Sequence, residues 1–219
     1  MGGIEGQLVI GLSLIILAWY FVGQQAMRRR GLLLLRWVRA GVGILGESPQ
    51  LRWLGGSAFQ LTLERPAPPF KAMAVTVVLE PREIFFLWLV NRFRKRRDVL
   101  VVRGDFATPP RVLFELFREA GRSGKEAKSM ATGERWTIES FEKSGLQLAS
   151  SSPMAYDALR IATQRAPAEL GALLRLSIRD TSPHLLLNYT LRPGLESDAS
   201  RVFHVLLDLV RALSAARQT

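Results

Sequence analysis

Hydrophobic residues form one long, uninterrupted run near the start of the chain. Residues 8–22 contain a single polar side chain, that of Ser13, and no charged residue falls between positions 7 and 27. A helix rises about 1.5 Å per residue, so roughly 20 residues cross a hydrocarbon core of about 30 Å, and residues 4–23 supply that length. The pattern predicts one transmembrane helix within an N-terminal membrane anchor, residues 1–30. The residues expected to meet the membrane are Leu8, Ile10, Leu12, Leu14, Ile15, Ile16, Leu17, Trp19, Tyr20 and Phe21.

The charges on the two sides of this run predict its orientation. Only Glu5 precedes the run, whereas Arg28, Arg29 and Arg30 follow it directly. Cytoplasmic flanks carry an excess of Lys and Arg, so we expect the N-terminus outside and the bulk of the chain in the cytoplasm, as in a protein of the bacterial inner membrane. Two alternatives fit less well, because a cleaved signal peptide would begin with cations and a buried core helix would have a polar face.

The rest of the chain switches between the two-residue period of strands and the helical period of 3.6 residues. Residues 31–50 are expected to form a juxtamembrane amphipathic helix and linker, and residues 121–133, which are polar and rich in Gly and Ser, a mobile loop. The expected strands cover residues 51–54, 59–65, 71–80, 98–106, 135–141, 146–150, 173–180 and 185–191, and the expected helices cover 82–97, 109–118, 154–164 and 200–215.

The order strand, turn, strand, helix occurs three times, over residues 59–97, 135–164 and 173–215. Strands joined by short turns pair antiparallel, and the helix that follows can cover one face of the sheet. We therefore expect an α+β fold, in which one transmembrane helix precedes a cytoplasmic domain of antiparallel hairpins and helices, residues 51–219.

Composition narrows the class of protein. Of 219 residues, 48% are hydrophobic and 22% are charged, which excludes a disordered chain. The absence of cysteine excludes disulfides, thiol catalysis and cysteine-bound metals, and two histidines leave little for a histidine metal site. The net charge of +11 is uneven, since residues 82–103 alone hold seven cations and two anions.

This basic segment contains the most informative pattern after the anchor. Seven apolar residues, 84–90, wrap fully around the expected helix, and a cluster of Arg and Lys follows them. Such a helix fits contact with lipid or a partner, with anionic headgroups neutralising the cations. The alternative is a core helix whose last turn carries cations, which the helix dipole favours. The expected contact surface comprises Phe85, Phe86, Trp88, Arg92, Phe93, Arg94, Lys95, Arg96 and Arg97.

No motif points to catalysis or to a cofactor. Residues 41–46 match G-x-G-x-x-G, but they follow a helical stretch and no strand. Residues 121–126 resemble the phosphate-binding loop only faintly, because Glu119 stands where its first glycine belongs and Glu126 replaces its Ser or Thr. Asp180, Ser182 and His184 share one expected turn and lack a separate element to orient them. We therefore predict no catalytic, cofactor-binding or metal-binding residue.

Together these patterns predict a non-catalytic single-pass membrane protein that serves as an accessory, assembly or scaffold subunit of a larger membrane complex. Its expected partners are other membrane-protein subunits and anionic membrane lipid. One alternative is an anchored peripheral domain that binds anionic lipid through residues 84–97, and a second is a membrane-bound enzyme with an unrecognised site. Nucleic acid is not expected, because no known binding module is visible.

Overall fold

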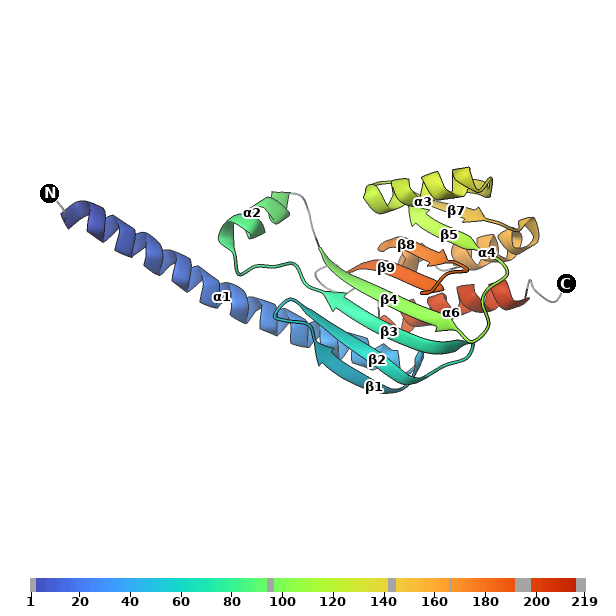
Figure 1. Cartoon of the computed structure of the whole chain (residues 1–219), viewed down its shortest axis with the longest axis horizontal. Helices are drawn as coiled ribbons and strands as arrows, with labels where there is room; N and C mark the ends of the chain where they lie inside the picture. The colour runs from blue at the N-terminus through green and yellow to red at the C-terminus, as the bar shows by residue number, and fades with distance from the viewer. Residues whose placement is uncertain (1–2, 94–96, 142–144, 166, 192–197, 216–219) are drawn as a thin grey trace.

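The computed structural model describes residues 3–93, 97–141, 145–165, 167–191 and 198–215. Within it, the N-terminal helix α1, Gly3–Val42, extends from an α+β domain as a single rod of 40 residues (Figure 1). The predicted anchor and the predicted juxtamembrane helix are therefore one continuous helix. The reason is that no Pro interrupts residues 24–42, and Gly31 and Gly41 each cost only about 1 kcal/mol relative to Ala.

The domain is built on one sheet of nine strands in the order β1-β2-β3-β4-β9-β8-β5-β7-β6, and every neighbouring pair is antiparallel. The α+β prediction is confirmed. The strands are β1 Gly46–Trp53, β2 Ala58–Pro66, β3 Phe70–Val78, β4 Asp98–Phe106, β5 Phe114–Arg118, β6 Thr137–Phe141, β7 Leu146–Ser150, β8 Leu173–Ile178 and β9 Leu185–Leu191. The remaining helices are α2 Phe85–Phe93, α3 Arg122–Gly133, α4 Pro153–Arg165, α5 Pro167–Leu170 and α6 Ala199–Ala215.

Two predicted elements are wrong. No helix forms over residues 109–118, and residues 114–118 are instead the strand β5. This strand pairs on both sides, with β7 and with β8, so non-local hydrogen bonding decides its conformation. The loop expected over residues 121–133 is the helix α3, in which Ala127 and Ala131 lie one turn apart and pack against Phe117. Its small residues suggested a loop but instead allow close packing on the sheet.

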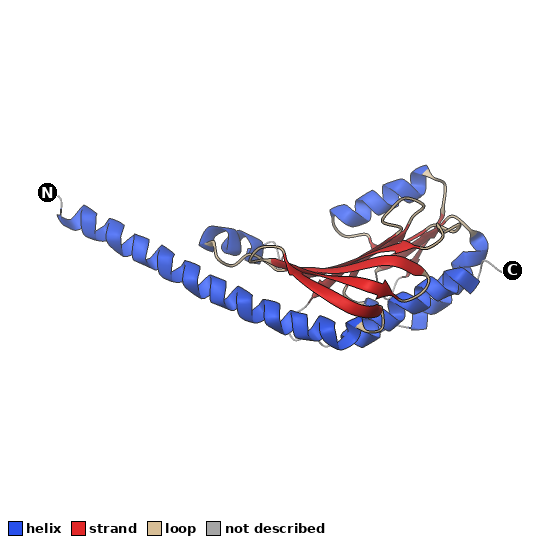
Figure 2. Cartoon of the chain, turned by 60° about the horizontal axis from the view of Figure 1, so that its bottom comes forward, coloured by secondary structure: helices blue, strands red, loops and turns tan. Residues whose placement is uncertain are grey.

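Helices cover the two faces of the sheet unequally (Figure 2). The second half of α1, together with α4, α5 and α6, packs on one face, where Leu34, Val38 and Val42 of α1 are fully buried in the main core. The helix α3 lies on the opposite face and packs chiefly on β5, β7 and β8. Among the described residues, no helix lies on the other half of that face, over β2, β3, β4 and β9 (Figure 2).

The predicted strand, strand, helix order is present as β2-β3-α2, β6-β7-α4 and β8-β9-α6. The expectation that each helix covers the sheet is wrong for α2, which lies beside α1 (Figure 1). Residues 79–84 carry the chain away from the sheet, and α2 finds its packing partner on the anchor helix.

Candidate functional site

The candidate site is the short helix α2 where it packs against α1. The Phe85 ring meets the Trp19 ring edge-on at a centroid distance of 4.9 Å, and the Trp88 ring lies 5.2 Å from the same indole. The Trp19 Nε1–H donates a hydrogen bond of 3.2 Å to the Arg82 carbonyl oxygen. A half-buried indole N–H requires such an acceptor, so Trp19 fixes both the side chains of α2 and the backbone leading into it.

Gly23 lets this backbone lie directly on the anchor helix. A Cβ added at Gly23 would lie 2.5 Å from the Arg82 carbonyl oxygen and 2.9 Å from the Glu83 Cα. One turn further, the Met27 sulfur accepts a hydrogen bond of 3.3 Å from the Arg82 N–H. Positions 19, 23 and 27 share one face of a helix. The start of α2 is therefore held by one stripe of α1.

The outer face of α2 is apolar and uncovered. Phe86, Val90 and Phe93 recur at the helical spacing i, i+4, i+7 and expose 73%, 44% and 79% of their surface. Trp88 is half-buried and Asn91 is buried on the inner side. Of the predicted aromatic contact residues, Phe86 and Phe93 thus face outward, whereas Phe85 and Trp88 pack on Trp19.

The first half of α1 is also exposed and apolar. Among the described residues, α1 is the one helix long and apolar enough to cross a membrane. Only 6% of its most apolar 18-residue stretch is buried by the rest of the protein. Such low burial is opposite to that of a core helix in a soluble protein. The exposed side chains include all the predicted membrane-facing residues except Trp19, which is half-buried under α2.

The predicted topology cations do not all face solvent. Arg28 and Arg29 are exposed at the end of the apolar stretch. Arg30 instead forms an ion pair of 2.8 Å with Asp98, which is 4% exposed and also accepts a hydrogen bond of 2.9 Å from the Glu80 N–H. Arg30 therefore joins α1 to the first residue of β4 and to the segment leading into α2.

The basic cluster after α2 is described only at its end. Arg97 is exposed immediately before β4. The side chain of Arg92 and the residues Arg94, Lys95 and Arg96 lie outside the part of the chain that the structure describes.

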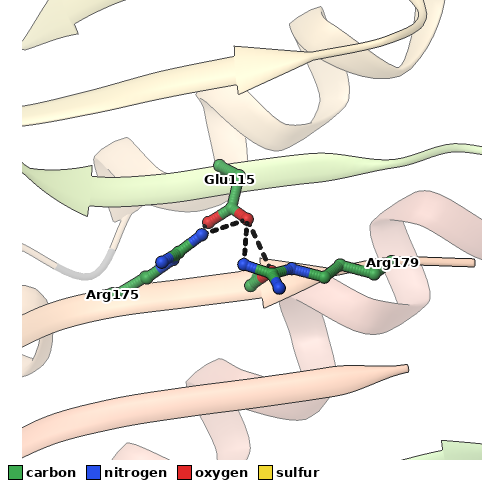
Figure 3. Close-up of polar contacts among 4 residues, drawn as sticks. Glu115, Arg175 and Arg179 are labelled. Carbon is green, nitrogen blue, oxygen red and sulfur yellow. Dashed lines mark hydrogen bonds and ion pairs between the residues drawn. The ribbon is translucent and has the colours of Figure 1, made fainter. Parts of the chain in front are cut away.

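A second charged group, which the sequence did not reveal, is buried on the face of the sheet that carries α3 (Figure 3). Glu115 of β5 is fully buried and accepts two hydrogen bonds of 2.8 Å from Arg175 of β8, a bidentate pair. The Ser177 hydroxyl donates to the same carboxylate at 2.6 Å, and Arg179 donates at 3.3 Å. Donors occupy both carboxylate oxygens, so this Glu115 cluster joins β5 to β8 and leaves no free base.

The motifs considered in the sequence have structural roles. Gly41 packs on the start of α6, where a Cβ would lie 2.6 Å from the Ser200 nitrogen, and residues 121–126 enter the first turns of α3. The buried His184 accepts a hydrogen bond of 3.1 Å from the Phe106 N–H through Nδ1. On α6, the His204 Nδ1 forms a hydrogen bond of 2.8 Å with the Ser200 carbonyl oxygen.

Among the described side chains, the Tyr156 hydroxyl has a clearly raised pKa. Burial, followed by a hydrogen bond to the Glu139 carboxylate and the charge of that carboxylate, raises the pKa of the Tyr156 hydroxyl. Because each cause favours the protonated phenol, Tyr156 remains a hydrogen-bond donor that ties α4 to the edge strand β6 throughout the physiological pH range.

The described residues contain no group of three or more His, Asp or Glu side chains that could hold a metal ion. No protein-family model matches the chain, and no curated protein matches it in sequence.

Proposed function

We propose that this chain is a non-catalytic, single-pass protein of the bacterial inner membrane that acts as an accessory, assembly or scaffold subunit. Its N-terminus lies outside, its α+β domain lies in the cytoplasm, and α2 lies in the cytoplasmic interface of the bilayer. The observation that supports this arrangement most strongly is the packing of α2 on Trp19 with Phe86, Val90 and Phe93 exposed.

The depth of α2 agrees with this arrangement. If the span ends near Gly23, Trp19 lies about 6 Å along the helix axis inside the hydrocarbon boundary. Interfacial helices bury their apolar face about 5–10 Å into the boundary between headgroups and acyl chains. A helix that contacts Trp19 is therefore at the depth where its exposed phenylalanines gain from lipid. Cleavage after a signal sequence would remove this partner from α2.

The scaffold role rests on the rigidity of the attachment and on the uncovered sheet face. The helix α1 runs from the span into the domain core without a break, and Arg30 pairs with Asp98 where the two meet. The domain is thereby held at one angle to the membrane, with half of one sheet face available for a partner subunit.

A fluorescent label at Phe86 tests the membrane contact. The chain has no cysteine, so Phe86→Cys gives a single labelling site in the full-length protein in vesicles. We expect brominated lipids to quench the label strongly. Ile161→Cys, an exposed apolar position on α4, is the matched control and should remain unquenched. Equal, weak quenching at both sites would contradict the docking of α2.

The subunit role has its own test. Gentle detergent extraction of native membranes, followed by native electrophoresis and mass spectrometry, should recover the chain in a stable complex with other membrane proteins. A clean monomer across several mild detergents would contradict the subunit role and leave the docking of α2 unaffected.

A second proposal concerns lipid selection by the cations around α2. Arg28, Arg29 and Arg97 are exposed near the expected membrane surface, and each cation near an anionic surface contributes about 1 kcal/mol. Quenching of the Phe86 label should therefore increase with the anionic lipid fraction at low salt. An equal signal in neutral and anionic vesicles would exclude an electrostatic contribution.

A further inference from the structure

A groove opens on the uncovered sheet face beside the connection from β3 to α2. Its volume is about 520 Å³, within the range of pockets that hold small molecules. Val78, Val99, Leu174 and Thr190 line its floor, and Glu80 and Arg97 stand at its rim. The groove lies at the end of the sheet from which α2 emerges.

The floor is one register row of the sheet. Val78 pairs with Val99, and Val99 pairs with Thr190, so their side chains lie side by side on three neighbouring strands. The next row on the same face contains Thr76, Val101 and Asn188. Apolar surface is thus concentrated in the row nearest to α2 and gives way to polar groups farther along the sheet.

The groove also lies close to the expected membrane surface. Leu79, which borders it, packs on α1, where a Cβ at Gly31 would lie 3.3 Å from its side chain. Gly31 is about 12 Å along the helix axis beyond Gly23. Headgroups extend about 5–8 Å beyond the hydrocarbon core. A lipid raised by a few ångströms from the cytoplasmic leaflet would therefore reach the groove.

The rim carries one charge of each sign. Glu80 and Arg97 each lie two residues beyond the Val78–Val99 pair on adjacent strands, so they flank the mouth. Their side chains form no ion pair or hydrogen bond with each other or with any other residue in the described part of the chain. A ligand with both an anionic and a cationic group complements such a rim, whereas a purely anionic ligand would meet Glu80 unfavourably.

We propose that this groove binds one aminophospholipid. Its phosphate accepts hydrogen bonds from Arg97, its primary ammonium group donates to Glu80, and its glycerol and upper acyl chain lie on Val78, Val99 and Leu174. This inference rests on the proposed membrane docking, which brings the groove to the leaflet. A choline headgroup lacks N–H donors for Glu80 and binds less well.

Native mass spectrometry of the full-length protein in detergent tests the proposal. After incubation with equal amounts of phosphatidylethanolamine, phosphatidylcholine and phosphatidylglycerol, we expect one phosphatidylethanolamine to be retained. Arg97→Gln and Glu80→Gln should each reduce its retention about tenfold, the effect of losing one charge-assisted hydrogen bond. Equal retention of the three lipids would overturn the assignment.

Matched variants separate the groove from other lipid contacts. Val99→Trp fills the groove and should abolish retention, whereas Val101→Trp lies one row away on the same strand and face and should preserve it. Equal retention in both variants would overturn the proposal. If phosphatidylethanolamine is not retained while brominated lipids still quench the Phe86 label, the groove proposal fails and the docking of α2 stands.

Discussion

Gly23 is the residue at which a single methyl group decides whether α2 can reach the anchor helix. Gly23→Ala places a Cβ 2.5 Å from the Arg82 carbonyl oxygen, and backbone cannot move aside as a flexible side chain can. We expect quenching of the Phe86 label by brominated lipid to fall to the level of the Ile161 control. Helix α1 itself should gain about 1 kcal/mol, because Ala is the better helix former.

The matched control for this substitution is Gly11→Ala. Gly11 also lies in the apolar stretch of α1, but an added Cβ there meets nothing within 4 Å. Quenching of the label should remain at the wild-type level. Equal quenching in the two variants would show that α2 does not depend on close approach to the anchor.

Among single side chains, we expect Glu115 to contribute most to the stability of the domain. Glu115→Ala leaves Arg175, which is 5% exposed, as a buried charge without its bidentate partner. Breaking a buried pair costs about 3–5 kcal/mol. For a chain of this size, we expect the midpoint of thermal unfolding in detergent to fall by roughly 6–20 °C.

Asp208→Ala provides the comparison for this loss. The ion pair of Asp208 with Arg211 lies on exposed surface, and such pairs contribute about 0–1 kcal/mol. Its unfolding midpoint should shift by no more than about 4 °C. A similar, small shift in both variants would show that the buried network contributes little.

At the scale of the element, the sequence predicts what local periodicity controls. The apolar N-terminal helix, most strands and the helices α4 and α6 follow from the spacing of their apolar residues. The strand β5 does not, because its conformation depends on pairing with residues of β7 and β8 that lie 28 to 64 positions away in the chain. The helix α3 does not either, since small residues that pack on Phe117 resemble those of a loop.

The candidate site was predictable only in part. Seven apolar residues followed by cations predict α2 as a contact element, and the structure shows that Phe86 and Phe93 are exposed. Its packing on Trp19 could not be derived, because these residues lie more than 60 positions apart and Gly23 gives no periodic signal. The pairing of Arg30 with Asp98 could not be derived either, because these residues are also far apart in the chain. A cation that follows an apolar run is interpreted from sequence as a signal of membrane orientation.

In the molecule as a whole, the single helix α1 holds both the α+β domain and the helix α2. Leu34, Val38 and Val42 fix the second half of α1 in the domain, and Trp19 and Gly23 fix α2 to the first half. Inserting one alanine between Gln25 and Ala26 turns these two faces by about 100° relative to each other. We expect α2 to lose Trp19 and the Phe86 label to lose its quenching, while the domain stays folded.

An alanine inserted between Gly11 and Leu12 is the control. It lengthens the span by about 1.5 Å and leaves every contact from Trp19 onward in register. Quenching should match that of the wild type. Loss of quenching in both variants would mean that the length of the span, and not the register of α1, places α2.

In the proposed membrane arrangement, the unbroken helix α1 also makes the domain sensitive to bilayer thickness. A span adjusts to thicker or thinner membranes by changing its tilt. A flexible linker would free a domain from such tilting, but here the 40 residues of α1 form a rod about 60 Å long that ends in the domain core. In the proposed arrangement, a change in tilt would therefore swing the whole sheet, so the proposed partner subunit would meet the sheet at an angle that depends on membrane thickness.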